Sequence, residues 1–332
     1  MKKVAFIRVF LFGFLPLLGL MTISVSLHAQ IDEKRTFPTP DSLMRKVGEE
    51  NVDTSYSFQW NKDSNQWEIH GRDLLFYNQK HKLFTRINQR WHNSAWMNVE
   101  REIKEYNDNG DVHQTLHQSW NEAAGTWVNL ELKTYLYNAQ GEKSEILYQQ
   151  WRKALGEWIS TVRYLFEYNR DGDNINILIR TYSSSTDDWL NFQRYLFSYS
   201  SSYGPPNEAI VQNWDRAEKD WVNTGRYYMA YNFRGNKIRE TRSTWIKSKK
   251  EWINGVRFLF EYDRRLKKSK TEQHWNSQTN EWNNAVKYKY YYDEEGELKE
   301  EDKYKWNRDD KKWVLIRKVR YSAEKIKPDL SK

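Results

Sequence analysis

One stretch of the sequence recurs along almost the whole chain: Trp245-Ile246-Lys247-Ser248-Lys249-Lys250-Glu251-Trp252-Ile253-Asn254-Gly255-Val256-Arg257-Phe258-Leu259-Phe260-Glu261-Tyr262. Its two tryptophans are seven residues apart, and a tyrosine follows the second by ten. The same pair occurs at Trp60/Trp67, Trp120/Trp127, Trp151/Trp158, Trp214/Trp221, Trp245/Trp252, Trp275/Trp282 and Trp306/Trp313. Two variants, Trp91/Trp96 and Tyr182/Trp189, complete a set that contains all 17 tryptophans. Successive pairs start 29 to 32 residues apart, so the chain is a tandem repeat with a period near 31 residues.

Within each unit the residue pattern has a period of two, which is typical of a β-strand. In the quoted unit, the even offsets from the second tryptophan are Asn254, Val256, Phe258, Phe260 and Tyr262. We expect these side chains to share one aromatic face with Trp252, while Arg257 at offset five points to the other face. Five units place a glycine four residues after the tyrosine, as a tight turn with positive φ requires.

The sequence therefore predicts an all-β fold made of antiparallel two-strand units, with strands over residues 67–77, 127–137, 158–168 and their equivalents. If each hairpin folds symmetrically between its tryptophans, the two rings face each other, a pairing that contributes up to about 1 kcal/mol. Eight or nine units give about 17 strands, more than a twisted open sheet usually holds. We therefore expect a long coiled or shell-like β-meander.

The N-terminal 29 residues have the pattern of a secretory signal peptide. Lys2, Lys3 and Arg8 precede an apolar run over 9–27, and Ala29 ends the segment. An uncleaved membrane anchor is the alternative, because the run is almost long enough to span a bilayer. We divide the chain into a signal peptide (1–29), an N-terminal linker with a short helix over 41–50 (30–57), a single β-repeat array (58–322) and a C-terminal tail (323–332).

Export to the periplasm, the cell surface or the extracellular space follows from this signal, with no integral membrane segment left after cleavage. The chain has no cysteine, so packing and backbone pairing must stabilise it without disulfides. Removing the three basic signal residues from the 53 in the chain leaves 50 against 45 acidic residues, a net charge of +5. This mild charge, with no known module, does not indicate a nucleic-acid partner. The sequence leaves the oligomeric state open.

The stretch Tyr290-Tyr291-Tyr292-Asp293-Glu294-Glu295-Gly296-Glu297-Leu298 resembles the Tyr-Asp repeat of RHS-type secreted bacterial proteins, whose strands wrap into a hollow β-shell. The Trp-Asn insert between the paired tryptophans is similar to tandem arrays in exported proteins of Gram-negative bacteria. The resemblance covers about residues 58–322 and implies an exported β-shell. We expect no toxin-delivery role, because no toxin domain follows the units in this sequence. Asp41-Ser42-Leu43 resembles a short O-glycan acceptor motif, and a helix N-cap explains it equally well.

No catalytic or metal-binding constellation stands out in the sequence. His113 and His117 are four residues apart, which on a strand separates them by about 13 Å, too far to share one ion. The chain has no cysteine nucleophile, no Gly-x-Ser-x-Gly turn and no phosphate-binding glycine loop. We therefore expect neither enzyme activity nor a cofactor. A glycoside hydrolase stays open as an alternative, because paired carboxylates can come from distant positions.

The aromatic row is the candidate binding surface, with a purely structural core as the other interpretation. Indole faces can pack against the C–H faces of sugars, and neighbouring asparagines can bond the hydroxyls. Trp, Tyr and Arg are also common anchors of protein interfaces. We therefore predict a binding or scaffold surface for a glycan or a protein partner, with a purely structural β-shell as the alternative. The surface consists of Trp127, Trp158, Trp189, Trp221, Asn223, Trp252, Asn254 and Trp282.

One local feature breaks the repetition. Residues 247–270 carry nine basic residues against three acids, and residues 293–302 carry seven acids against Lys299. Charge pairing between neighbouring hairpins explains both stretches. The alternative is a basic patch for an anionic partner such as a phosphorylated glycan. The predicted patch consists of Lys247, Lys249, Lys250, Arg264, Arg265, Lys267, Lys268 and Lys270.

Overall fold

The computed structural model describes residues 52–61, 66–201 and 204–320, and every regular element in them is a β-strand. The strands are β1 (Val52–Asn61), β2 (Gln66–Tyr77), β3 (Leu83–His92), β4 (Ala95–Tyr106), β5 (Val112–Asn121), β6 (Thr126–Tyr137), β7 (Lys143–Arg152), β8 (Glu157–Tyr168), β9 (Asn174–Ser183), β10 (Asp188–Ser198), β11 (Glu208–Asp215), β12 (Asp220–Tyr231), β13 (Lys237–Ile246), β14 (Glu251–Asp263), β15 (Leu266–Asn276), β16 (Glu281–Tyr292), β17 (Leu298–Asn307) and β18 (Lys312–Arg320).

This element list confirms the predicted all-β class, with 18 strands in place of about 17. β1 begins at Val52, before the boundary at residue 58 that the sequence indicated for the array. The signal peptide, Ser42 and the helix expected over 41–50 lie outside the described residues. In the described part of the chain, no helix is long and apolar enough to cross a membrane.

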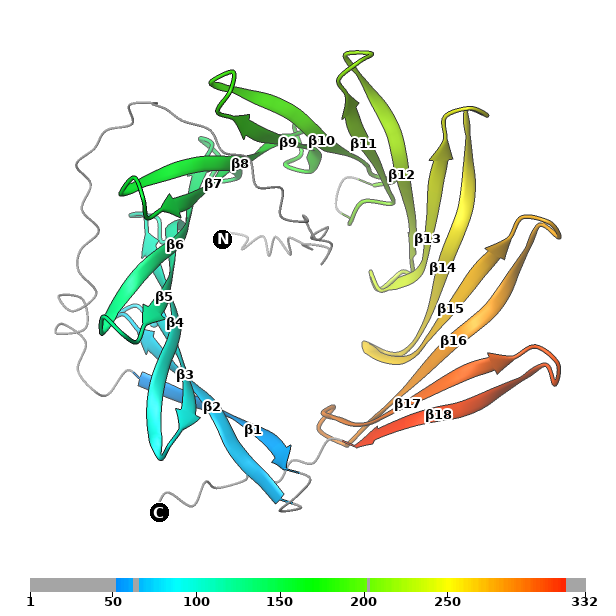
Figure 1. Cartoon of the computed structure of the whole chain (residues 1–332). Coiled ribbons are helices and arrows are strands. Elements are labelled where there is room, and N and C mark those ends of the chain that lie inside the picture. Colours follow the sequence, from blue (N-terminus) through cyan, green and yellow to red (C-terminus); the bar gives the residue numbers. More distant parts are fainter. Residues whose placement is uncertain (1–51, 62–65, 202–203, 321–332) are drawn as a thin grey trace, which may run out of the picture.

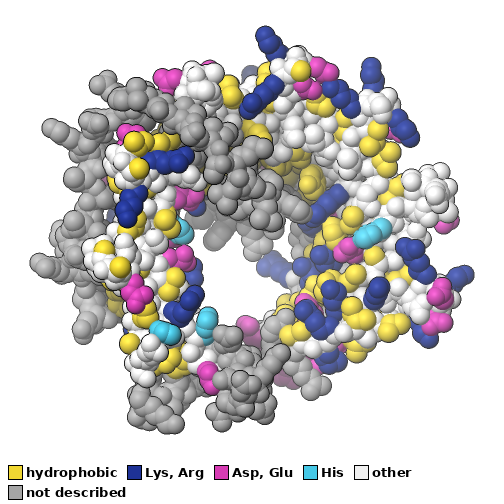
Figure 2. Space-filling model, viewed as in Figure 1, with side chains coloured by type: hydrophobic (Ala, Val, Ile, Leu, Met, Phe, Trp, Pro, Cys, Tyr) yellow, Lys and Arg dark blue, Asp and Glu magenta, His cyan; other side chains and the backbone are white. Residues whose placement is uncertain are grey.

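The strands form one antiparallel meander in chain order. Each strand pairs with the strand before it and the strand after it, and the described ladders include none between β1 and β18. Figure 1 shows the hairpins set side by side around a ring that stays open between its first and last strands. Figure 2 shows that the centre of this ring is open as well. The sheet therefore coils, as its strand number predicts.

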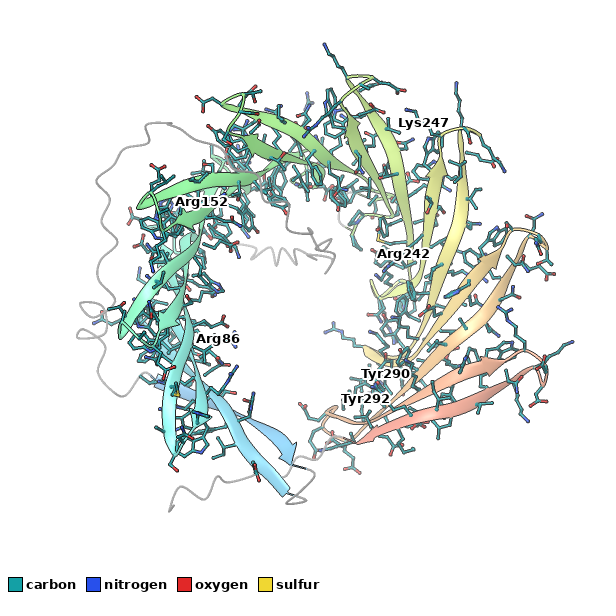
Figure 3. All side chains as sticks on the ribbon, viewed as in Figure 1. Arg86, Arg152, Arg242, Lys247, Tyr290 and Tyr292 are labelled. Atoms are coloured by element: carbon teal, nitrogen blue, oxygen red, sulfur yellow. The ribbon has the colours of Figure 1, made fainter. Side chains whose placement is uncertain are left out.

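The two kinds of turn lie on different rims of the ring (Figures 1 and 3). Lys247 and Arg152, which belong to turns between paired tryptophans, lie at the outer rim. Tyr290 and Tyr292, which precede a glycine turn, lie at the inner rim. We therefore call the turns between paired tryptophans the outer turns, and the turns after the repeated tyrosines the inner turns.

The paired tryptophans face each other, as predicted. Trp245 pairs directly with Trp252 across β13 and β14, and the equivalent residues pair in the other tryptophan hairpins. The rings meet edge to face, with centroids 4.8 to 5.1 Å apart. This arrangement sets the positive edge of one indole against the negative face of the other.

A β-bulge interrupts the second strand of each tryptophan hairpin. In β14, Asn254 pairs with Ser243 and Val256 pairs with Arg242, so Gly255 has no partner across the ladder. The same shift occurs in the equivalent hairpins. An extra residue exchanges the faces to which all later side chains of the strand point.

The bulge makes the predicted assignment of faces wrong. Trp252 and Asn254 lie on one face, but Phe258 and Phe260 lie on the other, and Arg257 joins the tryptophan. The period-two alternation holds on each side of the bulge. Across the bulge, the residues that share a face change from even to odd offsets. We call the two sides of the sheet the tryptophan face and the opposite face.

The repeated tyrosine closes the inner end of each hairpin. Its hydroxyl donates a hydrogen bond to a carbonyl oxygen 25 positions earlier, or 23 positions earlier for Tyr106, at or beside the start of the preceding strand. Burial raises the pKa of Tyr137 and of Tyr231 to about 12. The pairs, with O···O distances of 2.6 to 3.2 Å, are Tyr106 with Leu83, Tyr137 with Val112, Tyr168 with Lys143, Tyr199 with Asn174, Tyr231 with Pro206, Tyr262 with Lys237 and Tyr292 with Lys267.

The inner turns owe their shape to an asparagine and a glycine. Asn138 accepts hydrogen bonds on its side-chain oxygen from the backbone N–H groups of Gln140 and Glu142, at 3.0 and 2.9 Å. Gly141 has φ of +82° in the same turn, a conformation that costs other residues about 1 to 2 kcal/mol. The stretch Asn169 to Asp173, which resembles the start of a calcium loop, forms the same kind of turn.

Few side chains are fully buried, because most of the structure is a single layer of sheet. On the tryptophan face, Ile103, Leu116 and Leu132 form a buried cluster against which Trp158 packs. On the opposite face, Val211 and Met229 are buried near the middle of the array. All tryptophans from Trp91 onward are half-buried. The aromatic row is therefore neither a closed core nor a freely exposed strip.

Substitution of a turn glycine tests the role of these inner turns. We expect Gly141→Ala to lower the free energy of unfolding by about 1 kcal/mol, because alanine is strained at positive φ. Gly255→Ala is the matched control, since its φ is not positive and its new Cβ would lie 3.5 Å from the Arg242 carbonyl oxygen. Urea unfolding followed by tryptophan fluorescence measures both variants. Equal losses in the two would contradict the assignment.

Candidate binding surface

Arginines at offset five from the second tryptophan link most hairpins to the next on the tryptophan face. Arg257 on β14 reaches over β15 and places its guanidinium 4.5 Å from the ring centroid of Trp282 on β16. Such cation–π contacts contribute about 0.5 to 2 kcal/mol each. The pairs, 4.3 to 5.1 Å apart, are Arg72 over Trp96, Arg101 over Trp127, Arg163 over Trp189, Arg194 over Trp221, Arg226 over Trp252 and Arg257 over Trp282.

The one unit with a leucine at offset five keeps the contact by apolar packing. Leu132 occupies that position in β6, and Trp158 packs against the cluster that contains it. The period-two pattern predicted that Arg257 points away from the tryptophans, and this prediction is wrong. The recurrence of Arg at offset five in most units was the signal that could have revealed the contact.

In four of the six arginine links, a glutamine on the intervening strand adds hydrogen bonds. Gln273 on β15 accepts a hydrogen bond from Arg257 Nε at 2.8 Å and donates one to Asn284 on β16 at 2.8 Å. The same chain of contacts joins Arg101, Gln118 and Asn129 at 2.5 and 2.6 Å. In these four units the guanidinium and amide groups bond to neighbouring strands, so side-chain hydrogen bonds add to those of the backbone ladder.

These contacts account for the predicted aromatic surface. Trp127, Trp189, Trp221, Trp252 and Trp282 each carry a guanidinium over the ring, and most also meet their partner ring edge to face. Asn223 accepts from Gln212 at 2.7 Å, and Asn254 accepts from Ser243 at 3.1 Å. The groups that a sugar would contact are therefore already engaged within the sheet.

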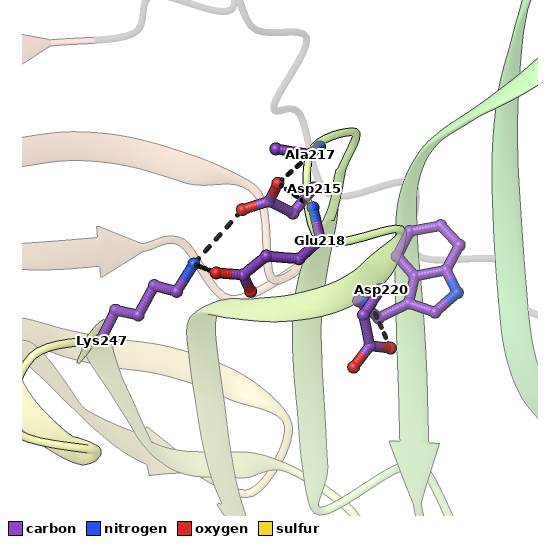
Figure 4. Close-up of polar contacts among 6 residues, drawn as sticks. Asp215, Ala217, Glu218, Asp220 and Lys247 are labelled. Atoms are coloured by element: carbon purple, nitrogen blue, oxygen red, sulfur yellow. Dashed lines mark hydrogen bonds and ion pairs between the residues drawn. The ribbon is translucent and has the colours of Figure 1, made fainter.

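The structure divides the predicted basic patch between the two rims. Lys247 lies at the outer rim, where its amine is 2.7 Å from Glu218 and 3.3 Å from Asp215 of the preceding hairpin's outer turn (Figure 4). Lys249 lies 3.7 Å from Glu251, and Lys250 occupies the same turn with φ of +52°. Charge pairing between hairpins therefore explains Lys247.

The other members of the patch lie toward the inner end of the same hairpins. Arg264 and Arg265 form the inner turn between β14 and β15, and Lys268 is exposed beside it. Lys267 and Lys270 point to the opposite face. The acidic residues at 293–302 were expected to form ion pairs with this basic patch, but they have other partners. Asp293 binds Lys299, and the carboxylates at 300–302 bind residues of β18.

On the opposite face, lysines of β15 lie over aromatic rings of the adjacent strands. The Lys270 amine is 4.5 Å from the ring centroid of Phe258 on β14 and 5.8 Å from that of Tyr288 on β16. The Lys267 amine is 5.6 Å from Phe260 and 5.8 Å from Tyr290. This part of the opposite face is cationic and aromatic together.

The same face has a different character near β4 and β5. Glu102 lies 3.4 Å from His117 and 3.0 Å from Lys104. Hydrogen bonding from His117, then from Lys104, lowers the pKa of Glu102 to about 2. Hydrogen bonding to Glu102 raises the pKa of His117. Here the charges are mixed and paired, so the opposite face changes its chemistry along the array.

Within the described ranges, no three His, Asp or Glu side chains gather into a group that could hold a metal ion. The described surfaces carry charged groups, aromatic rings and hydrogen-bonding groups.

No protein-family model matches the chain, and no curated protein matches its sequence. Solved structures match in part. A protein of unknown function from Bacteroides fragilis is 18% identical over 38% of this chain and 91% of that one, with a TM-score of 0.34. A porin-like protein from Bacteroides uniformis is 14% identical over 82% of this chain and 96% of that one, with a TM-score of 0.33.

The Photorhabdus luminescens Tc holotoxin pore also contains a similar chain. That chain is 12% identical over 83% of this chain and 18% of that one, with a TM-score of 0.26. The structural neighbours therefore include a Tc toxin, at low identity and over a small part of its length. These similarities do not assign a function.

Two units with an offset-five arginine lack the glutamine, one with Ser243 opposite Arg226 and one with Arg180 opposite Arg163, and the second provides a test of the relay. Arg180 stands where other units have glutamine, opposite Arg163, and the Nε atoms of both are buried without a hydrogen-bond partner in the described part of the chain. Burial and then repulsion from Arg180 help to lower the pKa of Arg163. We expect Arg180→Gln to raise the free energy of unfolding by about 1 kcal/mol, because it restores the relay to Asn191.

Gln212→Arg is the matched reverse change. It removes the 2.5 Å bond from Arg194 and the 2.7 Å bond to Asn223, and it places two guanidinium groups together. We expect a loss of about 1 kcal/mol, measured by urea unfolding under the same conditions. If both variants changed the free energy of unfolding in the same direction, the result would contradict the relay.

The pair of His117 and Glu102 predicts a pH dependence of stability. The raised pKa of His117 contributes stability that is present below 6.5, its ordinary pKa, and is lost as the pH rises through the folded value. The lowered pKa of Glu102 contributes stability that is present above 4.5 and is lost as the pH falls toward 2. The pair therefore stabilises most between about pH 4.5 and 6.5.

Comparing the wild type with His117→Gln measures this contribution. We expect a stability difference of only a few tenths of a kcal/mol near pH 5.5, because both side chains are partly exposed, and a smaller one at pH 8.5. His92→Gln, at an exposed position of the outer rim, is the control and should show no pH-dependent difference. A difference for His117→Gln that grows with pH would disprove the pairing.

Proposed function

We propose that the chain is an exported repeat protein without enzyme activity, and that its coiled sheet binds a glycan or a protein partner. The supporting observation is the contrast between its two faces. The tryptophan face repeats the same contacts from hairpin to hairpin, whereas the opposite face changes from mixed ion pairs around Glu102 to lysines over aromatic rings around Lys270. Residues that repeat hold neighbouring units together, and residues that vary are free to specify a ligand.

This contrast moves the proposed binding surface away from the aromatic row. The ligand would lie along the opposite face and the inner rim. There, most aromatic and charged side chains do not take part in the contacts that repeat from hairpin to hairpin. The proposal of export rests on the signal-like pattern of residues 1–29. The proposal of no enzyme activity rests on the repetition itself, since equivalent units seldom assemble a single reactive centre.

A binding assay with a check on the ligand tests this function. The mature protein, starting at Gln30, is applied to an array of neutral and anionic glycans, and each bound glycan is recovered and weighed by mass spectrometry. We expect retention of at least one glycan class with its mass unchanged. Shortened products would favour the glycoside hydrolase, and no binding to any glycan would favour a protein partner or a structural shell.

Deletion of one whole unit tests the repeat architecture on which the surface depends. Removing residues 143–173 joins the end of one inner turn to Asn174 and keeps every remaining strand antiparallel. We expect an all-β circular dichroism spectrum and bound ligand at a reduced amount per molecule, because a repeat array loses stability and reach in increments. Deleting only residues 143–156 is the control. It removes one strand and its turn, reverses the direction of later strands and should prevent folding.

A further inference from the structure

The inner turn between β12 and β13 differs from the other inner turns in what it exposes. Phe233 at its tip is 91% exposed, the highest value among the exposed large hydrophobic residues. Arg234 follows it, with its guanidinium 5.0 Å from the phenyl centroid. The residues equivalent to Phe233 in other inner turns are Asp108, Ala139, Arg170 and Glu294. The turn itself therefore does not require an aromatic residue.

The next inner turn is the short connection between β14 and β15. Only Arg264 and Arg265 stand between the two strands, and Arg264 has φ of +53°. An open cavity of about 780 Å³ lies beside this connection, lined by Arg234, Asp263, Arg264, Arg265 and Leu266. Its volume is within the range of small-ligand sites. Arginines from two successive inner turns thus line one cavity.

A hydrogen bond ties these two turns together. The side-chain amide of Asn236 donates to the carbonyl oxygen of Arg264 at 3.0 Å. This contact fixes the turn that carries Arg234 against the turn that carries Arg264 and Arg265. The backbones that carry the arginines are therefore held together before any ligand arrives, which reduces the entropic cost of binding.

The charge of the cavity is positive. Three guanidinium groups and the single carboxylate of Asp263 line it. Nearby, burial and then repulsion from Lys270 and Lys237 lower the pKa of Lys267. Figure 2 shows Lys and Arg side chains gathered at the inner edge of this part of the ring.

An acidic turn bounds the positive region on one side. Leu266 of the cavity lies 3.9 Å from the point that a Cβ on Gly296 would occupy, in the inner turn between β16 and β17. That turn carries Asp293, Glu294, Glu295 and Glu297. The described inner rim is therefore acidic at this turn.

We propose that this cavity binds the acidic group of an anionic polysaccharide, a sulfate, phosphate or carboxylate, while the Phe233 ring packs against a neighbouring sugar. Guanidinium groups form paired hydrogen bonds with such oxyanions. The exposed ring offers a flat apolar surface to sugar C–H groups at the mouth of the cavity. This inference rests on the proposed binding function and names its ligand class.

A saccharide fits the site better than a nucleic acid does. Single-stranded nucleic acids need a basic groove that follows the backbone, with several rings for successive bases. The site has one fully exposed ring, and the acidic turn at 293–297 interrupts the basic inner rim. A chain with spaced acidic groups and apolar sugar faces matches this limited arrangement.

Binding of dextran sulfate to the whole mature protein tests the proposal, with unmodified dextran as the neutral probe. We expect dextran sulfate to bind and dextran to bind at least about tenfold more weakly, because only the sulfated chain engages the guanidinium groups. Arg234→Ala with Arg265→Ala should weaken dextran sulfate binding by at least about tenfold. Phe233→Ala should weaken the binding of dextran sulfate without changing the binding of free inorganic sulfate.

A charge-matched variant separates the site from the general charge of the protein. Arg152→Ala with Arg216→Ala removes the same two charges at exposed positions of the outer rim and should change binding by less than about twofold. Circular dichroism and urea unfolding of each variant check that the fold is retained. Equal weakening by the inner and outer pairs would overturn the proposal.

The remaining outcomes distinguish this inference from the proposed function. Binding of a neutral glycan alone would leave the binding function standing and overturn the anion site. Binding of thirty-nucleotide oligothymidylate as tightly as dextran sulfate, with the same loss in the Arg234 and Arg265 variant, would overturn the saccharide assignment in favour of nucleic acid. No binding of any glycan would overturn the anion site and leave a protein partner as the remaining form of the proposed function.

Discussion

The contact on which the rest of the structure depends is the arginine that lies over the tryptophan of the next hairpin. Backbone ladders join neighbouring strands, but a single-layer sheet of this length has little apolar volume to bury. The arginine reaches across a whole strand, so it ties together units that the ladder links only through an intermediate. Repeated from unit to unit, it stiffens the ring without a second layer of structure.

The β-bulge is what makes this contact available. Without the unpaired residue after Asn254, Arg257 would point away from the tryptophans and Phe258 would lie among them. One extra residue thus divides each long strand into two segments of opposite phase. The outer segment supplies tryptophan and asparagine to one face, and the inner segment supplies arginine to the same face and aromatic rings to the other.

This division also separates stability from recognition. The tryptophan face uses the same few residue types in successive units, and their polar groups bond one another. Apart from the repeated tyrosine and the asparagine and glycine of its turn, the side chains of the opposite face and the inner turns have no such repeated partners. They can therefore differ between units at little cost to the fold. Phe233 and the arginines around the neighbouring cavity lie where the repeat imposes the fewest requirements.

The sequence by itself determined the all-β class, the period near 31 residues, the hairpins and the facing tryptophan pairs. These features are local, because a hairpin is specified by turn residues and by the spacing of residues across it. The sequence did not determine which face each side chain occupies, since the bulge follows a pairing register that residue alternation cannot show. The sequence also could not show that Lys247 and Arg264 lie on opposite rims, or that Arg234 and Arg265 line the same cavity. Those placements depend on how successive hairpins stack around the ring, and only the tertiary structure decides them because they join residues some thirty positions apart.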